Sequence, residues 1–413
     1  MSDNSTKAAA AEVVAAEQKA PASSGRLGSF VHFVTGDHRY VLLATSTVAL
    51  LGMWLSAQQR SAMSFLAPLF VVELVMYYAL VAWLLLSAAG LVTKLMHWHD
   101  YAQKSPFARD PLRTIERYGS YLVVLITCVL FVDRLVMGFV SVTMRAIAAD
   151  SIPEDGLAAA LYMLYEGRDL FITGIVTTVE LAVFGTSIAF FLALLMAALR
   201  ILKVDRPDND FVRFLKALGA GFAKAYSTVI RGTPMMVQAL IIYNAGFAAL
   251  RGMGLTVTEI NGLWSTFIAG LVTVSLNSTA YMMEVLRGGI ESVDPGQMEA
   301  ARSLGLSQWQ AMLRVVFPQG IKFAVPGLSN ELVINIKDSS VLSIIGVVEL
   351  MFEARSVAGI YYRNLEVYLV AAFCYLILTM VATWLLNHLS RRLDAPRMST
   401  TSDSTNAAGV AND

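Results

Sequence analysis

The chain has 413 residues, of which 56% are hydrophobic and only 15% are charged. Soluble globular domains carry about 25% charged residues, so this composition excludes an ordinary soluble protein and indicates a membrane-embedded one. Basic and acidic side chains are equal in number, 31 of each, and give no net charge that would favour nucleic-acid binding. The two cysteines, Cys128 and Cys374, lie in apolar runs and predict neither a disulfide framework nor a metal site.

Two polar segments flank the apolar part of the chain. We expect residues 1–28 and 391–413 to be disordered tails on the cytoplasmic side. Between them, eight apolar runs have about the 20 residues that a helix needs to cross a bilayer. In chain order they cover residues 40–58, 65–93, 119–141, 171–199, 233–250, 263–286, 321–350 and 365–388. Polar residues interrupt the seventh run, a pattern typical of a broken helix with a re-entrant piece.

Basic residues are distributed asymmetrically between the segments that join these runs. With the amino terminus in the cytoplasm, the inner segments hold 23 lysines and arginines and the outer segments hold six. Cytoplasmic loops carry such an excess of positive charge. We therefore predict an all-α membrane protein with about eight transmembrane helices and both termini in the cytoplasm. Residues 151–170 then form an acidic external loop.

Two charged residues of the second and third runs lie at about the same depth in the membrane. Glu73 and Arg134 lie at similar distances from the outer ends of their runs, and Asp133 is adjacent to Arg134. Charges inside a bilayer are costly and usually pair with one another. We therefore expect a Glu73–Arg134 ion pair between the two helices.

The segment 204–230 has helical periodicity, with Phe211, Phe214 and Leu218 on one side. We interpret it as an amphipathic helix on the inner membrane surface. A cytoplasmic extension of the preceding span is the alternative. The sequence RGTP follows, and we expect Pro234 in the first turn of the fifth span with Arg231 reaching toward lipid headgroups.

The segment 294–318 has the pattern of two short soluble helices. Asp294 is a suitable N-cap, Pro295 suits the first helical position, and Gln297 would complete a capping box. Gly305 would end this first helix, because glycine readily adopts the left-handed conformation beyond a helix C-terminus.

The second short helix would be capped by Ser307, with Gln310 in its capping box, and would end at Pro318. Three interpretations of the pair are open: a docking element for a cytoplasmic partner, a simple connector, or a DNA-binding helix-turn-helix. The third is disfavoured because only Arg302 and Arg314 are basic, too few to neutralise several phosphates.

Polar residues in the sixth and seventh runs indicate a path through the membrane, because such groups are costly in a bilayer. Lys337 suits a substrate carboxylate, Glu331 or Asp338 suits an ammonium group, and Ser339 could cap a half-helix that faces the substrate. The alternative role is structural, through hydrogen bonds between helices. The residues assigned to the path are Asn277, Ser278, Tyr281, Glu331, Lys337, Asp338 and Ser339.

The short helices also resemble a known motif. Glu299-Ala300-Ala301, Gly305 and Pro318 follow the EAA motif of membrane subunits of ATP-binding-cassette (ABC) importers, with Val315 and Phe317 at positions where the motif has Ile and Leu. The flanking segments 231–246, 280–310 and 326–350 resemble the polar amino-acid permease branch, which includes histidine, glutamate, glutamine, arginine and opine permeases. The resemblance covers roughly residues 170–390 and does not cover 1–169.

This resemblance implies a MetI-like five-helix permease core at 171–390, preceded by an extension at 29–150 with three transmembrane helices. The EAA hairpin at 294–318 would be a cytoplasmic coupling element that docks on an ATPase. The residues implied in coupling are Glu299, Ala300, Ala301, Arg302, Gly305, Trp309 and Pro318.

The expected protein is a permease subunit for a polar amino acid in the bacterial cytoplasmic membrane. The sequence contains no G-x-x-x-x-G-K-[ST] loop to hold phosphates. We therefore expect no enzyme activity, cofactor or metal in this chain, with ATP and magnesium bound by a partner. The implied partners are an ABC ATPase dimer, a second permease subunit (the same or a different chain), an extracytoplasmic solute-binding protein and membrane lipid, but no nucleic acid. An ion-coupled secondary transporter and a membrane scaffold without transport are the alternatives.

Overall fold

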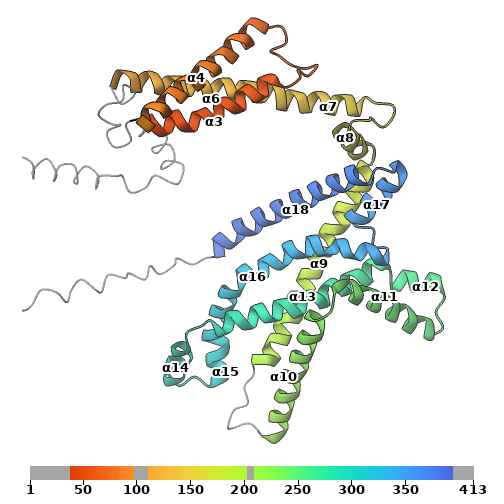
Figure 1. Ribbon diagram of the computed structural model, residues 1–413. Coiled ribbons are helices and arrows are strands. Elements are labelled where there is room, and N and C mark those ends of the chain that lie inside the picture. Colours follow the sequence, from red (N-terminus) through yellow and green to blue (C-terminus); the bar gives the residue numbers. More distant parts are fainter. Residues whose placement is uncertain (1–37, 97–109, 202–208, 394–413) are drawn as a thin grey trace, which may run out of the picture. The chain divides into compact units, whose positions relative to one another are not determined.

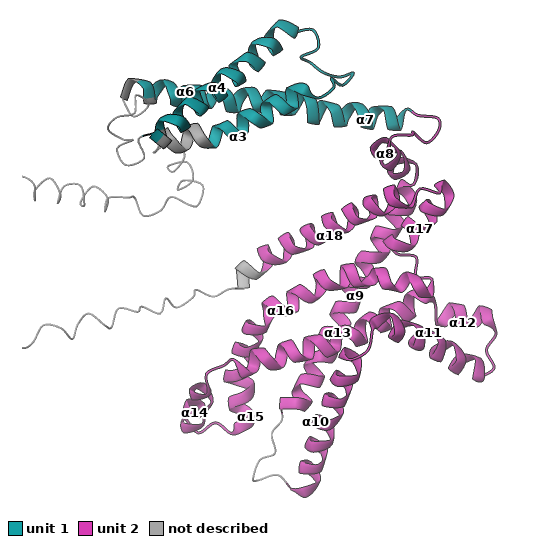
Figure 2. Ribbon diagram, in the orientation of Figure 1, with its two compact units in different colours: residues 1–148 teal, residues 149–413 magenta. Residues whose placement is uncertain are grey.

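The structure is a computed structural model that describes residues 38–96, 110–201 and 209–393. The chain divides into two compact units, residues 1–148 and 149–413 (Figure 2). All regular secondary structure in the described residues is helical (Figure 1), which confirms the all-α prediction. The predicted tails lie outside the described residues, except that 391–393 belong to the last helix. The predicted domain boundaries remain predictions.

The first unit is built from three long helical segments joined by short connectors. Its helices are α3 (His38–Ala57), α4 (Phe70–Met96), α6 (Asp110–Phe131), the π-helical turn η2 (Val132–Val136) and α7 (Met137–Ile147). The second apolar run was predicted to start at residue 65, but α4 starts at Phe70. The intervening residues form turns in which the Leu66 backbone N–H donates to Asp133 at 3.1 Å.

A small apolar core holds the first unit together. Leu55, Leu80, Trp83 and Leu130 are buried in it, with Leu66 from the connector. Because lipid tails are as apolar as these side chains, close packing rather than removal from water favours the association of such helices in a membrane. The Trp83 indole N–H also donates to the Thr45 hydroxyl at 3.1 Å, so the polar edge of the ring is satisfied.

The second unit contains thirteen elements among the described residues. These are α8 (Gly156–Glu166), α9 (Arg168–Ile201), α10 (Asp210–Arg231), α11 (Met235–Gly252), α12 (Val257–Leu263), α13 (Thr266–Glu291), α14 (Pro295–Ser303), α15 (Gln308–Ala311), η3 (Met312–Val316), α16 (Phe317–Asp338), η4 (Ser339–Ile345), α17 (Leu350–Tyr361) and α18 (Asn364–Leu393).

Helix α13 is the centre of the second unit and packs against α9, α10, α11 and α16. In its most apolar 18-residue window 56% of the residues are buried, against 17–33% in the other candidate membrane helices. Against it and α10, α9 presents Ala189, Ala193 and Ala197, all buried and four residues apart. Small residues at this spacing let helix backbones approach closely, which is how membrane helices commonly associate.

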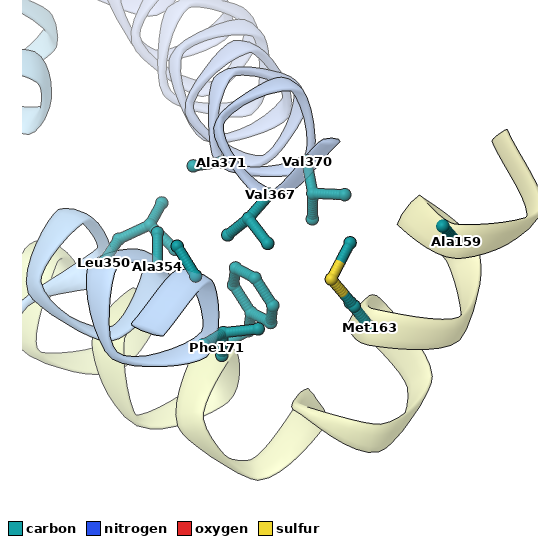
Figure 3. Packing of buried hydrophobic residues seen from close by; sticks show 10 residues of the cluster. Ala159, Met163, Phe171, Leu350, Ala354, Val367, Val370 and Ala371 are labelled. Atoms are coloured by element: carbon teal, nitrogen blue, oxygen red, sulfur yellow. The ribbon is translucent and has the colours of Figure 1, made fainter. Parts of the chain in front are cut away.

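The segment predicted as an acidic external loop contains helix α8. The Asp155 carboxylate caps it by accepting from the Ala158 backbone N–H at 3.2 Å. Ala159 and Met163, four residues apart, pack with Phe171 and Val367 in a buried apolar cluster (Figure 3). The segment is thus partly helical, because this spacing places both side chains on one helix face; its location outside the membrane stays a prediction.

Within the described part of the chain, five helices are long and apolar enough to cross a membrane, or six if α10 and α11, which meet at a 110° bend, form one broken span. The predicted number of eight and the orientation of the termini are not confirmed. The first predicted run corresponds to a shorter apolar helix, Ala44–Ala57. The seventh is not a single span, because α16 ends at Asp338, a 3-10 helix follows, and α17 starts at Leu350.

The predicted amphipathic helix corresponds to α10, although residues 204–208 lie outside the described part. Its small residues pack against neighbouring helices: Ala223 is buried with Ala193 and Ala197 of α9 and Met283 of α13. Helix α10 is therefore an integral part of the helix bundle as well as amphipathic. Its exposed face carries Phe211, Phe214, Leu215, Leu218 and Phe222.

Candidate functional site

A pocket of about 510 Å³, which we call the path pocket, lies where the α10–α11 bend meets α13 and α16. Residues from both parts of the predicted path line it together with residues of the RGTP segment. The lining residues are Arg231, Gly232, Thr233, Pro234, Met235, Asn277, Tyr281, Glu331, Ile334, Asn335 and Asp338.

Gln238 of α11 holds the bend beside this pocket in shape. Proline has no backbone N–H, so Pro234 cannot donate to the carbonyl of Ile230 four residues earlier. The Gln238 side-chain amide donates to that carbonyl instead, at 2.7 Å, and also to the Thr233 carbonyl at 2.9 Å. Its own carbonyl oxygen accepts from Asn277 at 3.0 Å, which connects the bend to α13.

A second series of side-chain hydrogen bonds, which we call the polar chain, joins three helices on the other side of Asn277. Ser278 of α13 donates to the Asn335 carbonyl oxygen at 2.8 Å, and the Asn335 amide donates to Thr186 of α9 at 2.7 Å. Ser278 and Asn335 are buried. Since unpaired polar groups are costly in an apolar interior, these bonds fix the register of α9, α13 and α16 around the pocket.

The structure brings four of the seven predicted path residues together in the lining of the pocket, two on each of two helices. Asn277 and Tyr281 come from α13, and Glu331 and Asp338 come from α16. Asn277 and Glu331 are buried, while Tyr281 is 39% exposed. Polar residues of both predicted runs therefore line one pocket, and their role in a transport path stays a prediction.

The other three predicted path residues do not line the pocket. Ser278 lies behind it in the polar chain. Lys337 is exposed and is not a lining residue. Ser339 is fully buried, and its hydroxyl donates to the Ile336 carbonyl at 2.8 Å instead of capping a half-helix.

Sequence reasoning missed two residues of the site and misjudged a third. Gln238 and Asn335 were not assigned to the path, although a glutamine four residues after a proline is a usable signal for a replaced backbone bond. Arg231 was expected to reach headgroups, but its guanidinium lies over the Tyr281 ring, 5.4 Å from the centroid, and lines the pocket. Pro234 is the N-cap of α11 rather than part of its first turn.

A second pocket of about 460 Å³, which we call the hairpin-side pocket, adjoins the first and shares Arg231, Gly232 and Tyr281 with it. Its other lining residues are Arg200, Lys224, Ser227, Thr228 and Glu284.

Glu284 of α13 is the only carboxylate in this second lining and has several partners. It accepts from Arg200, from the Ser227 hydroxyl at 3.1 Å and from Arg287 at 2.9 Å. Arg231 lies 4.0 Å from the same carboxylate. The ends of α9 and α10 are thus connected to α13 just before the chain enters the hairpin.

The hairpin itself begins as predicted, with one exception. The Asp294 carboxylate accepts from the Gly296 backbone N–H at 2.7 Å, and Pro295 is the first residue of α14. The predicted capping box with Gln297 is absent. The Gln297 side chain accepts instead from Gln319 of α16, at 3.5 Å.

The turn between the two short helices depends on Gly305. It has a φ of 88°, and its N–H donates to the Arg302 carbonyl at 3.0 Å while the Leu306 N–H donates to the Ala301 carbonyl at 3.3 Å. This pair of bonds is the Schellman motif, which ends helices at a left-handed residue. The predicted helix stop at Gly305 is confirmed.

The second helix starts as predicted but does not stop at Pro318. Ser307 and Gln310 form a complete capping box, with bonds of 3.0 and 3.2 Å. The helix then continues through the π-helical turn η3 into α16. In this turn the Phe317 N–H donates to the Met312 carbonyl, five residues back, and the wider turn accommodates the proline that follows.

The hairpin has a buried base and an exposed apolar tip. Met298 and Met312 pack on Ile290, Val293 and Val316 at the base. At the tip Leu304 is 85% exposed and Trp309 is 52% exposed. Of the other predicted coupling residues, Ala301 is buried, and Glu299, Ala300 and Arg302 are exposed. An exposed tip on an anchored base is the arrangement expected of a docking element.

Comparison with known proteins defines the class of this chain. Residues 221–395 match the family described as binding-protein-dependent transport system inner membrane component. The nopaline transport system permease protein of Agrobacterium fabrum is 34% identical over 245 residues, which cover 56% of this chain and 95% of the relative. The glutamine transport system permease protein of Escherichia coli is 36% identical over 171 residues, which cover 41% of this chain and 74% of the relative.

Among solved structures, a chain of an amino acid ABC transporter crystallised with histidines is 34% identical. The match covers 55% of this chain and 96% of that chain, with a TM-score of 0.47. The chain therefore belongs to the family of binding-protein-dependent transport system inner membrane components, and it is a multi-pass membrane protein of the ABC permease class.

Proposed function

We propose that this chain is the permease subunit of an ATP-driven importer for a polar amino acid and forms its transmembrane path. Relatives named for nopaline and glutamine transport support the substrate class. The acidic side chains of Glu331 and Asp338 in the path pocket suit an ammonium group, and the guanidinium of Arg231 suits a carboxylate.

The observation that carries the proposal is the covalent connection between the hairpin and both polar walls of the path pocket. Helix α13, which carries Asn277 and Tyr281, ends at Glu291, and three residues separate it from α14. Helix α16, which carries Glu331 and Asp338, continues from α15 without a break. A displacement of the hairpin would therefore move both helices that line the pocket.

Close contact between the two helices next to the hairpin strengthens this connection. A Cβ atom added to Gly289 of α13 would lie 2.6 Å from the carbonyl oxygen of Gly320 of α16. The backbones touch here because neither residue has a side chain. The hairpin and the adjoining ends of α13 and α16 form one anchored element, suited to transmitting a movement.

The proposed assembly follows from this design. An ABC ATPase dimer holds ATP and magnesium and receives the hairpin, with Leu304 and Trp309 as apolar contacts and Glu299, Ala300 and Arg302 around them. A second permease subunit completes the path, and an extracytoplasmic binding protein delivers the substrate. The chain holds no cofactor of its own and resides in the bacterial cytoplasmic membrane.

Reconstitution of the chain with its ATPase and binding protein in proteoliposomes tests the proposal. Glutamine, glutamate, histidine, arginine and nopaline would be supplied in turn as radiolabelled compounds. We expect uptake of at least one that requires ATP hydrolysis and stops with a non-hydrolysable analogue. Uptake driven by an ion gradient without the ATPase would instead identify a secondary transporter, and no uptake under any condition would favour a scaffold.

Path residues are tested in the same vesicles. Glu331→Gln removes a buried carboxylate from the pocket, and we expect uptake at limiting substrate to fall by about 10- to 100-fold, the equivalent of one charged hydrogen bond. Lys337→Gln, which changes a charge on the same helix outside the lining, should leave uptake within about twofold. Equal effects of the two substitutions would contradict the assignment of the path pocket.

A further inference from the structure

The charges of the hairpin-side pocket are unbalanced. Its lining carries the cations of Arg200, Lys224 and Arg231 but only the carboxylate of Glu284. Glu284 is also an acceptor for Arg287, so its two oxygens are occupied mainly by Arg200 and Arg287. The lining therefore contains more positive charge than its own carboxylate neutralises.

Two of the cations remain available to a ligand. The Arg231 side chain is 45% exposed and comes no closer than 4.0 Å to a carboxylate. Lys224 is exposed and has no ion-pair partner among the described residues. Two cationic groups without a carboxylate at close range form a suitable environment for the carboxylate of a ligand.

The pocket is next to the path. Arg231 and Tyr281 belong to both linings, and the guanidinium of Arg231 lies over the Tyr281 ring. On one side of this pair the path pocket holds Glu331 and Asp338, and on the other side the hairpin-side pocket holds Arg200 and Lys224. A molecule that passes between the two pockets moves from acidic to basic surroundings.

We propose that the hairpin-side pocket is a second binding site for the imported compound, which holds its carboxylate by Lys224 and Arg231 as it leaves the path pocket. The Arg231–Tyr281 pair separates the two sites. Arg231 lines both pockets, so it keeps hold of the carboxylate while the ammonium group leaves Glu331 and Asp338, and the compound has no need to release both charges at once. This inference rests on the proposed import function and adds an exit site to it.

A staged exit lowers the energetic cost of the passage. An unpaired carboxylate is unfavourable in low-dielectric surroundings, and nearby cations offset that cost. The cations are partly exposed, so the attraction is moderate and screened by salt. Binding of moderate strength is what an exit site needs, because the compound must also leave.

An anionic lipid headgroup offers the same ligand chemistry as a carboxylate, namely anionic oxygens, and must be distinguished experimentally. The sequence provides a simple reporter because it contains only two cysteines, Cys128 and Cys374. Cys128→Ser and Cys374→Ala remove both. Thr228→Cys then introduces a single thiol into the hairpin-side pocket. Thr228 is exposed, and its hydroxyl donates only to a carbonyl within its own helix, so the exchange is mild.

The full chain with its ATPase would be placed in phosphatidylcholine nanodiscs, where both membrane faces are accessible. Labelling rates are measured with an anionic sulfonate-bearing and a cationic trimethylammonium-bearing methanethiosulfonate, each normalised to its rate with free 2-mercaptoethanol. At low salt we expect a preference for the anionic reagent of about tenfold, because a charged cleft concentrates counter-ions. Lys224→Gln should reduce this preference, whereas Arg213→Gln on the exposed part of the same helix should not.

Protection then tests the ligand. Whichever amino acid the uptake assay identifies is compared with its decarboxylated counterpart, for example glutamine with 4-aminobutanamide or arginine with agmatine, which lack the α-carboxylate. Whichever amino acid is imported should slow labelling at least threefold, and its decarboxylated counterpart should not. Three outcomes would overturn the exit-site proposal: equal protection by the imported amino acid and its decarboxylated counterpart, no protection by either of these two compounds, or protection only when phosphatidylglycerol is added. Since uptake is measured separately, these results would leave the import function standing, and failure of ATP-dependent uptake would refute that function by itself.

Discussion

Both units of this protein contain a cluster of carboxylates and arginines, but the two clusters differ in exposure. In the first unit the side chains of Asp133, Arg134 and Glu73 are 0%, 1% and 7% exposed. In the second unit Glu284 is 17% exposed, and its partners Arg200 and Arg231 are 23% and 45% exposed.

Hydrogen bonding follows the same division. In the first unit Arg134 pairs with both Glu73 and Asp133, and the Asp133 carboxylate also accepts from the Ser64 hydroxyl at 2.8 and 2.9 Å. The predicted Glu73–Arg134 pair is confirmed. We call this the sealed cluster. It has a structural role, because removing one member of a buried ion pair leaves the other buried without a partner. We call Glu284 with its arginine partners the open cluster; it lines a pocket and retains unpaired charge for a ligand.

The sealed cluster should give the largest effect. Arg134→Met leaves the buried Asp133 carboxylate without its cation and leaves Glu73 with only the partly exposed Arg60, and we expect a loss of about 3–5 kcal/mol in the free energy of unfolding of the first unit. Thermal unfolding of the detergent-solubilised chain measures it. Arg60→Gln is the control, since Arg60 pairs with Glu73 at 2.7 Å but is 36% exposed, and we expect a loss of only about 0–1 kcal/mol. Equal losses of stability for the two variants would refute the distinction between the buried ion pair and the partly exposed one.

A smaller effect is expected from the bend beside the path pocket. Gln238→Leu removes the donor that serves the Ile230 carbonyl and the acceptor of Asn277, so buried polar groups lose their partners. We expect a destabilisation of about 1–3 kcal/mol. Asn244→Leu on the same helix, where the side chain donates only to the Leu240 carbonyl and is exposed, should cost about 0.5 kcal/mol or less. A neutral Gln238→Leu variant would show that the bend does not depend on this side chain.

The hairpin turn should respond to a single added methyl group. Gly305→Ala forces alanine into the left-handed region at a φ of 88°, which costs roughly 1–2 kcal/mol. No atom crowds the added Cβ, so the backbone conformation alone is tested. Gly288→Ala in the interior of α13, where the Cβ position is also open, should instead stabilise by about 0.4–1 kcal/mol. Hydrogen exchange of the α14 amides reports the difference, and identical exchange in both variants would contradict the turn assignment.

The open cluster should give the smallest change in stability. Glu284→Gln removes the charge from a residue with several partners, yet those partners are partly exposed and can be solvated. We expect a loss of no more than about 1 kcal/mol in the same thermal unfolding assay. If Glu284→Gln destabilised the protein as much as Arg134→Met does, the open cluster would be as structural as the sealed one.

Local features of the sequence predicted local structure well. The Ser307–Gln310 capping box and the glycine stop at Gly305 depend on residues within a few positions, and both are present. The Glu73–Arg134 pair was predictable despite its 61-residue separation, because membrane depth constrains which charges can meet. Helix α8 was not predicted, although Asp155 is a residue type that commonly caps a helix N-terminus.

Features that depend on packing between distant segments were not predictable. The Asn335–Thr186 bond spans 149 positions, and nothing near either residue indicates it. Pro318 continues a helix instead of ending it, because the preceding π-helical turn changes the hydrogen-bond register. Lys337 was assigned to the path for its charge, but the helical position that keeps it out of the lining is set by the packing of α16.

The central claim is that the exposed hairpin tip couples an ATPase to the path pocket. The direct measurement is ATP-dependent uptake and ATP hydrolysis by proteoliposomes that contain a Leu304→Ala/Trp309→Ala double variant, with Leu313→Ala as an exposed control on η3. The account predicts that the double variant loses uptake by at least about tenfold, since two apolar anchors of an interface are removed, while Leu313→Ala retains it. Normal uptake and normal substrate-stimulated hydrolysis by the double variant would contradict the account.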